Sequence, residues 1–121
     1  MPTINEVIER VDRVKLNGYE DRTKAGWLIE LDGKLYAETL HSIGTEPPRE
    51  YPKNGDKPLV VETPYDNLYD LYLYAMIDFN NREIANYNNS MTMFNVALDE
   101  FKKQYHRTHL PPPVGGFRNV F

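Results

Sequence analysis

Two sets of side chains in this sequence have types and spacings that suit metal or acid–base chemistry. His106 and His109 stand three residues apart, so a helix would place both imidazoles on one face. A metal site needs a third ligand, which the neighbouring sequence does not supply. The run from Leu110 to Pro113 also ends the helix at this point. We therefore expect neither a metal site nor a cofactor.

Asp66, Asp70 and Asp78 form the second set, because carboxylates on one helix can serve acid–base or di-metal chemistry. No Glu-x-x-His motif accompanies them, and the neighbouring sequence lacks charge partners for them. The three histidines are scattered and indicate no Ser/His/Asp arrangement, and the absence of cysteine excludes a disulfide or a thiolate site. The sequence thus predicts a protein that is not an enzyme and acts through shape and contacts.

The charge of the chain is uneven. The net charge is −4, but every charged residue after Glu100 is basic, so the first hundred residues carry about −8. These basic residues are Lys102, Lys103, Arg107 and Arg118. They suit either a helix C-terminus or a tail that docks on an acidic neighbour, and both interpretations stay open. An acidic body argues against a general nucleic-acid binder, which needs a basic patch.

The length of 121 residues suits one domain. No apolar run approaches the length of a membrane span. The first residues, MPTINEVIERVDRV, lack the apolar core of a secretion signal, so we expect synthesis in the cytosol and no contact with a membrane.

Two amphipathic helices are expected in the first forty residues. Thr3 and Glu6 have the spacing of a capping box, which starts the first helix, and Asn17-Gly18 is a turn signal that ends it. The acidic pair at 20–21 suits the start of the second helix. The positions expected to face the core are Ile4, Val7, Ile8, Val11, Val14, Ala25, Leu28, Leu31, Leu35 and Leu40.

Two residues of the second helix have more than one interpretation. Trp27 lies beside the apolar stripe, either as an anchor at the edge of the core or as a hot spot in a subunit contact. Gly33 lies in mid-helix, where glycine costs about 1 kcal/mol, and indicates either close helix packing or a small kink.

The helical pattern stops from 42 to 63, a segment with four prolines and two glycines. Connections of this length are usually functional or mobile. Residues 53–56 are typical of a tight turn, so residues 49–51 and 59–61 have the right placement to pair as a short hairpin. The prolines would limit this pairing to a few hydrogen bonds. The sequence therefore leaves open a long loop or a short β-hairpin.

The region from Pro64 to His109 is the centre of the predicted fold, because its apolar residues recur at three- and four-residue steps. Thr63-Pro64 suits the cap and first turn of a helix. The asparagine-rich segment 80–90 indicates one long kinked helix or two antiparallel helices, and we favour a break near Asn89-Ser90. The stripe consists of Leu68, Leu71, Tyr72, Ala75, Phe79, Tyr87, Met91, Phe94, Leu98, Phe101 and Tyr105.

The C-terminal stretch, LPPPVGGFRNVF, begins with three prolines, which favour an extended form. Gly115-Gly116 suits a hinge. The stretch either folds back onto the body or forms an arm that inserts its aromatic end into another chain. The apolar residues after the hinge are Phe117, Val120 and Phe121.

Together these elements predict a mainly α fold, with about four helices in a small bundle. A single helical domain is expected at 1–110, with the loop or hairpin at 42–63 inserted between its second and third helices. An extended arm at 111–121 follows it.

Three segments carry a resemblance to a known family. They are INEVIERVDRVK, EDRTKAGWLIELDGKLY and the run that starts KPLVVETPYDNLYDLYLYAMID and ends FKKQYHRTH. These segments resemble the small head–tail connector proteins, or head-completion adaptors, of tailed phages and Gram-positive prophages. The most specific parts are Trp27–Gly33 and Pro64–Asn95, and the likeness is weakest at 42–57 and after Pro113.

The resemblance implies a mainly helical subunit with no cofactor and no reaction. In that family, about a dozen copies form a ring beneath the portal protein, prolong the DNA exit channel and support the stopper or tail-completion protein. It implies a place at the head–tail interface of the virion, and in the host cytoplasm during assembly. DNA would be passing cargo only, and we hypothesise that the acidic surface lines the channel, since basic residues would hold the phosphates.

A small helical regulator or antitoxin-like binding module is the alternative class, and it would require a basic recognition helix that the sequence does not show. For a connector, we expect the 42–63 loop and the 110–121 arm to make contacts. The residues that we expect to contact partners are Trp27, Tyr51, Lys53, Asn54, Arg107, Pro111, Pro112, Phe117, Arg118 and Phe121.

Overall fold

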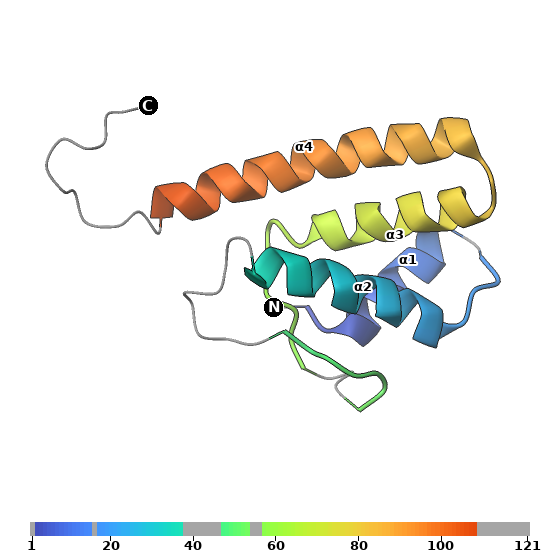
Figure 1. Cartoon of the computed structure of the whole chain (residues 1–121), viewed down its shortest axis with the longest axis horizontal. Helices are drawn as coiled ribbons and strands as arrows, with labels where there is room; N and C mark the ends of the chain where they lie inside the picture. Colours follow the sequence, from blue (N-terminus) through green and yellow to red (C-terminus); the bar gives the residue numbers. More distant parts are fainter. Residues whose placement is uncertain (1, 16, 38–46, 54–56, 109–121) are drawn as a thin grey trace, which may run out of the picture.

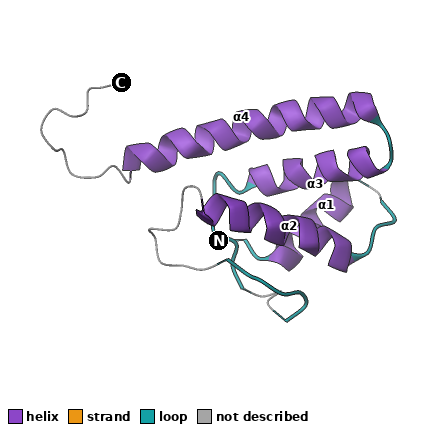
Figure 2. Cartoon of the chain, in the orientation of Figure 1, coloured by secondary structure: helices purple, strands orange, loops and turns teal. Residues whose placement is uncertain are grey.

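The structure is a computed structural model that describes residues 2–15, 17–37, 47–53 and 57–108, with side chains as far as Tyr105. Its helices are α1 (Ile4–Val14), α2 (Asp21–Leu35), α3 (Asn67–Asn80) and α4 (Ile84–Thr108), as Figure 1 shows. No strand occurs among the described residues (Figure 2). The predicted mainly α fold, with four helices in a small bundle, is confirmed.

α3 is the central helix of the bundle. α4 packs along one side of it as the second half of a helical hairpin, and α1 and α2 also contact α3 and each other (Figure 1). One hydrophobic core joins all four helices. The buried apolar residues that α3 and α4 contribute are Leu68, Tyr69, Leu73, Ala75, Ile77, Phe94, Phe101 and Tyr105.

α1 begins with the predicted capping box. Thr3 Oγ1 accepts a hydrogen bond from the backbone N–H of Glu6 (3.2 Å), and the Glu6 carboxylate accepts one from the N–H of Thr3 (2.9 Å). The prediction for Val14 is wrong: this side chain is 73% exposed, because α1 ends there. The predicted core positions that are buried are Ile4, Val7, Ile8 and Val11.

α2 follows Glu20, close to its predicted start. At Gly33 no neighbouring atom lies within 4 Å of the place that a Cβ would occupy, so the interpretation of Gly33 as a close-packing site is wrong. Leu40 lies outside the described residues. The predicted core positions of this helix that are buried are Ala25, Leu28, Leu31 and Leu35.

The connection between α2 and α3 is a long loop, and its described parts do not form the alternative hairpin. An isolated bridge pairs Thr3 with Pro58, and the N–H of Leu59 donates to the carbonyl of Pro2 (2.7 Å). Proline supplies no N–H for a ladder, so pairing stops there. The segment 59–61 then enters the core, where its three side chains are buried.

α3 begins at Asn67, three residues later than predicted. Thr63-Pro64 lies in a turn in which the N–H of Tyr65 donates to the carbonyl of Glu62 (2.9 Å). The N-cap position belongs to Asp66, whose side chain makes no capping hydrogen bond. The cap prediction is therefore wrong, because the chain completes a separate turn before the helix starts.

The break between α3 and α4 lies at 81–83 and not near Asn89-Ser90. Two helices are present, as favoured, but the predicted position of the break is wrong. Arg82 has a φ of 62°, a left-handed conformation that cannot continue α3. The Asn80 side chain donates to the carbonyl of Met76 (2.8 Å) and helps to end the helix. The asparagines at 86, 88 and 89 are exposed on α4, so they do not interrupt its core face.

The aspartates of α3 and its N-cap do have charge partners, which come from α1 and the residue that follows it. Arg10 Nη1 lies 3.0 Å from Asp66 Oδ2, and its Nη2 lies 2.7 Å from Asp70 Oδ1. Lys15 Nζ lies 2.7 Å from Asp78 Oδ1, and Asp78 is buried. The expectation that partners are missing is therefore wrong, because it considered only residues close in sequence. These ion pairs hold α1 against α3.

A buried hydrogen-bond network joins α2, the loop and α3, and we call it the Asp32 network. Asp32 Oδ1 accepts a hydrogen bond from the Tyr69 hydroxyl (2.5 Å), and the N–H of Val60 donates to the two Asp32 oxygens (3.3 and 3.2 Å). The N–H of Val61 donates to the Tyr69 hydroxyl (2.9 Å). Each of these four residues is buried, so each polar group depends on its partner in the network.

The network changes the acidity of both its side chains. Burial raises the pKa of Asp32 to about 6, although the hydrogen bonds from Tyr69 and Val60 act in the opposite direction. Burial, together with the nearby Asp32, raises the pKa of Tyr69 well above its ordinary value. The network therefore contains a neutral Tyr69 that donates to Asp32, and Asp32 exchanges its proton near pH 6.

We expect Tyr69→Phe to lower the free energy of unfolding by about 2–4 kcal/mol, because Asp32 and the Val61 N–H both lose a buried partner. Helical content should stay unchanged. Urea unfolding followed by circular dichroism measures the effect. The matched control is Tyr72→Phe on the same helix, which keeps the Tyr72 ring contact with Phe94 (centroids 5.2 Å apart). Equal losses in both variants would contradict a role for the Tyr69 hydroxyl.

The raised pKa of Asp32 predicts a dependence of stability on pH. Because the folded state holds this proton more tightly than the unfolded state does, the contribution of Asp32 is most favourable below about pH 4, near its unfolded pKa. It declines as the pH rises through about 6, the folded pKa, by up to about 3 kcal/mol. Asp32→Asn should lack this decline, so the difference in unfolding free energy between wild type and variant should change across this range. If the unfolding free energies of wild type and variant change with pH in the same way, the prediction is wrong.

Candidate partner-binding surfaces

Two of the four aromatic residues predicted to contact partners are described by the structure, and both have partners within the chain. Trp27 is half-buried, and its ring packs against Tyr19 in a T-shaped contact (centroids 5.7 Å apart). Tyr51 is also half-buried: its hydroxyl donates to Asn5 Oδ1 (3.0 Å), and its carbonyl accepts from Arg22 Nη1 (3.4 Å). The half-buried ring of Trp27 and its contact with Tyr19 agree with an anchor at the edge of the core. Its role as a hot spot in a subunit contact stays a prediction.

The remaining predicted contact residues are described only in part. Lys53 is exposed in a turn of the loop. Arg107 belongs to the last turn of α4, but its side chain lies outside the described ones. Also outside the described residues are Asn54, Pro111, Pro112, Phe117, Arg118 and Phe121.

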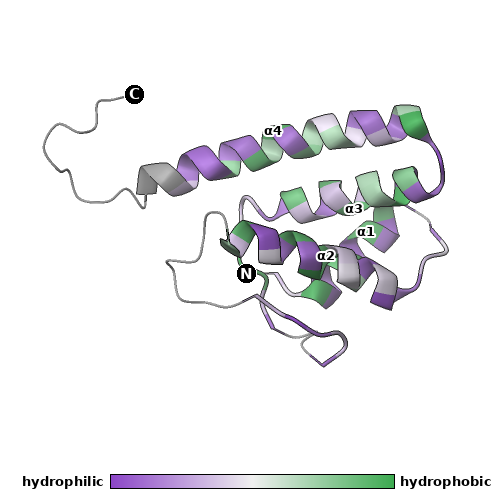
Figure 3. Cartoon of the chain, viewed as in Figure 1, coloured by the Kyte–Doolittle hydropathy of each residue, from purple (hydrophilic) through white to green (hydrophobic). Residues whose placement is uncertain are grey.

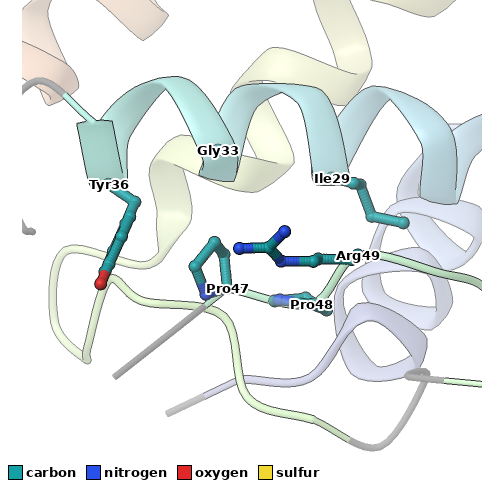
Figure 4. A pocket seen from close by; sticks show the side chains of 6 residues that line it. All are labelled: Ile29, Gly33, Tyr36, Pro47, Pro48 and Arg49. Atoms are coloured by element: carbon teal, nitrogen blue, oxygen red, sulfur yellow. The ribbon is translucent and has the colours of Figure 1, made fainter. Parts of the chain in front are cut away.

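A cleft that the sequence analysis missed lies between α2 and the loop after Pro47 (Figure 4). Its volume is about 350 Å³. Figure 4 shows Tyr36 at one end of the cleft and Ile29 toward the other, with Arg49 and the two prolines opposite the helix. We call it the α2 cleft, and its lining residues are Ile29, Gly33, Tyr36, Pro47, Pro48 and Arg49.

The lining of the α2 cleft suits one or two apolar side chains of a peptide. It combines an aromatic ring, two proline rings and an aliphatic side chain with a single guanidinium, which attracts aromatic faces and carbonyl oxygens. The volume lies at the low end of the usual range for small-molecule sites, about 300–1,000 Å³. The sequence does contain a signal for this cleft: positions 29, 33 and 36 share a helix face on which glycine leaves a gap.

The Asp32 network helps to position the cleft. Asp32 precedes Gly33 on α2 and binds the loop through the N–H of Val60. Nearer the cleft, the loop is held by the hydrogen bond from Tyr51 to Asn5 of α1. Pro47 and its neighbour are buried, so the loop wall of the cleft packs on the body.

Exposed apolar side chains form two further surfaces. At the end of the bundle where α3 turns into α4, Phe79 and Ile84 are 51% and 56% exposed, and Figure 3 shows hydrophobic residues on both helices there. Phe79 was predicted to face the core; its ring instead packs on Tyr87 (centroids 5.2 Å apart) at the surface. Met93 and Val96 of α4 are 52% and 55% exposed. We call the pair Met93 and Val96 the α4 patch.

In the described part of the chain, no three histidine, aspartate or glutamate side chains are placed to hold a metal ion. Within the same residues, no helix has both the length and the apolar character needed to cross a membrane. Comparisons of this chain with protein-family models, with curated proteins and with solved structures find no match.

Proposed function

We propose that this chain is a structural subunit of a phage or prophage virion, a head–tail connector. Its copies would form a ring of about a dozen beneath the portal protein, prolong the DNA channel and support the stopper or tail-completion protein. The resemblance of Trp27–Gly33 and Pro64–Asn95 to that family supports the proposal. These segments fall on α2 and on the α3–α4 hairpin, which carry the α2 cleft and the exposed apolar residues.

The observation that carries the proposal is the one-sided packing of α4. This helix packs along α3, while Met93 and Val96 of the α4 patch stay more than half exposed. Fully burying an exposed side chain of this kind contributes about 1.5–3 kcal/mol. Each of these two can gain about half of that burial from a partner, so the patch favours contact with another chain. A ring of like subunits needs two different surfaces on each copy. The α4 patch and the α2 cleft lie on different helices and are candidates for these surfaces.

The charge of the chain fits a protein that DNA passes without binding. The net charge is −4, and an acidic wall repels phosphates where a basic wall would hold them. In this proposal the subunit acts at the head–tail interface of the virion and occupies the host cytoplasm during assembly.

We expect the wild-type chain to comigrate with the portal ring encoded beside its gene, at about one copy per portal subunit. Size-exclusion chromatography with light scattering measures this. The double variant Met93→Asp with Val96→Asp should fail to comigrate, because it places charge in the apolar contact. The matched control, Asn89→Asp with Asn95→Asp, adds the same charge at exposed positions of α4 and should comigrate.

Two outcomes of this experiment would contradict the proposal. If the wild-type chain separates cleanly from an intact portal ring while folded, the connector assignment fails and the regulator class gains support. If the patch variant and the control bind equally well, the α4 patch is not a contact surface. Each substitution is at an exposed site, so stability should change by no more than about 0.5 kcal/mol.

Deletion of residues 111–121 should leave the helical content nearly unchanged and abolish incorporation into heads. The last helix, α4, ends at Thr108, so the deletion removes no residue of any of the four helices. Circular dichroism measures the first effect, and the protein content of purified heads measures the second. A loss of helicity on deletion would instead make the arm part of the core.

A further inference from the structure

The α2 cleft lacks an assigned occupant, and its chemistry restricts the choice. Its apolar lining comes from Tyr36, Ile29 and the pair Pro47-Pro48, and Arg49 adds the positive charge. Gly33 leaves the helix wall open, since no neighbouring atom lies within 4 Å of a Cβ built there. Such a site suits an aromatic ring in an extended peptide, because a ring stacks on tyrosine and proline rings.

The C-terminal end of α4 extends beyond the start of α3 (Figure 1). Phe101 lies level with the start of α3, because its ring contacts Tyr65 (centroids 6.1 Å apart). α4 continues to Thr108, which adds about 10 Å of helix beyond that contact. Figure 1 shows α4 running past the first turn of α3. The segment that follows therefore starts at a point that projects from the bundle.

The sequence after Thr108 has the composition that the cleft requires. Residues 109–121 read HLPPPVGGFRNVF, with a proline run before the aromatic end. When extended, they reach at most about 43 Å, which is enough to cross to an adjacent subunit. Phe117 and Phe121 are the aromatic side chains available in this segment.

We propose that the α2 cleft of one copy receives the aromatic end of the 109–121 segment of the adjacent copy. This inference rests on the proposed ring and names one of its subunit contacts. α2 and α4 end at the same end of the bundle (Figure 1), so the segment can reach its own cleft or a neighbour's, and it is the ring proposed above that favours the neighbour's. Phe117 or Phe121 would enter between Tyr36 and the proline pair of the cleft. Three prolines in a row favour an extended chain, which would lower the entropy cost of binding.

Disulfide trapping tests the contact in the full-length protein, because the chain has no native cysteine. One chain carries Gly33→Cys in the cleft, and a second chain with a different tag carries Asn119→Cys, which leaves both phenylalanines in place. The matched control replaces Gly33→Cys by Gly26→Cys, at an exposed glycine of α2 that also has no atom within 4 Å of a Cβ. Mixed chains are oxidised over a range of protein concentrations, and mixed disulfides are counted by mass spectrometry.

We expect the Gly33→Cys chain to form mixed disulfides at least about tenfold faster than the more exposed Gly26→Cys chain. Adding Phe117→Ala and Phe121→Ala to the Asn119→Cys chain should remove this preference. Equal rates at the two glycines overturn the proposal. A chain with both Gly33→Cys and Asn119→Cys should form linked multimers, and a closed monomer as its main product would place the segment in its own cleft and overturn the contact between copies.

The portal experiment separates failure of this contact from failure of the proposed function. If the disulfide forms preferentially at Gly33→Cys but the chain does not bind the portal ring, the contact between copies stands and the connector assignment is wrong. Portal binding without selective trapping would keep the connector and overturn this subunit contact.

Discussion

The carboxylate of Asp32 is the point on which the packing of this protein depends. It lies inside the core and holds a helix, a loop and a second helix together through Tyr69 and the N–H of Val60. A buried charge is costly unless it is hydrogen-bonded, so these contacts define one arrangement of the loop and oppose others. The apolar segment 59–61 stays in the core because this arrangement satisfies its backbone.

Ion pairs fix the position of α3 in addition to the Asp32 network. Arg10 joins α1 to Asp66 and Asp70 at the start of α3. At the other end of α3, Asp78 forms an ion pair with Lys15, the residue after α1, and accepts a hydrogen bond from Ser90 of α4 (3.2 Å). Both ends of the central helix are therefore fixed by charge. α4 has its main packing contact with α3, so the side of α4 that faces away from α3 has no such packing contact within the described part of the chain.

Sequence reasoning succeeded where local patterns decide the structure. The capping box at Thr3 and the apolar spacing of α1 and α2 predicted both helices, because these signals act within a few residues. It failed where partners are distant in the chain. The charge partners of Asp70 and Asp78 are Arg10 on α1 and Lys15 just after it, and the left-handed turn at Arg82 contains no glycine that would have predicted it.

The candidate surfaces were harder to predict than the helices for the same reason. Trp27 and Tyr51 were chosen by residue type, yet both are occupied by contacts within the chain. The α2 cleft forms only when the loop at Pro47 meets positions 29, 33 and 36 of α2. The spacing of positions 29, 33 and 36 indicates a gap on one helix face, but it does not show that the loop at Pro47 forms the opposite wall.

The distant anchoring of the loop also has a consequence for how the chain folds. The α3–α4 hairpin joins helices that are neighbours in sequence, so it can form by closing a short turn. Val60 and Asp32 are 28 residues apart, and bringing them together requires closure of a much longer loop. We expect the hairpin to form early and the loop to dock late. The α2 cleft would then be among the last features to appear, so it would be open only on subunits that have finished folding.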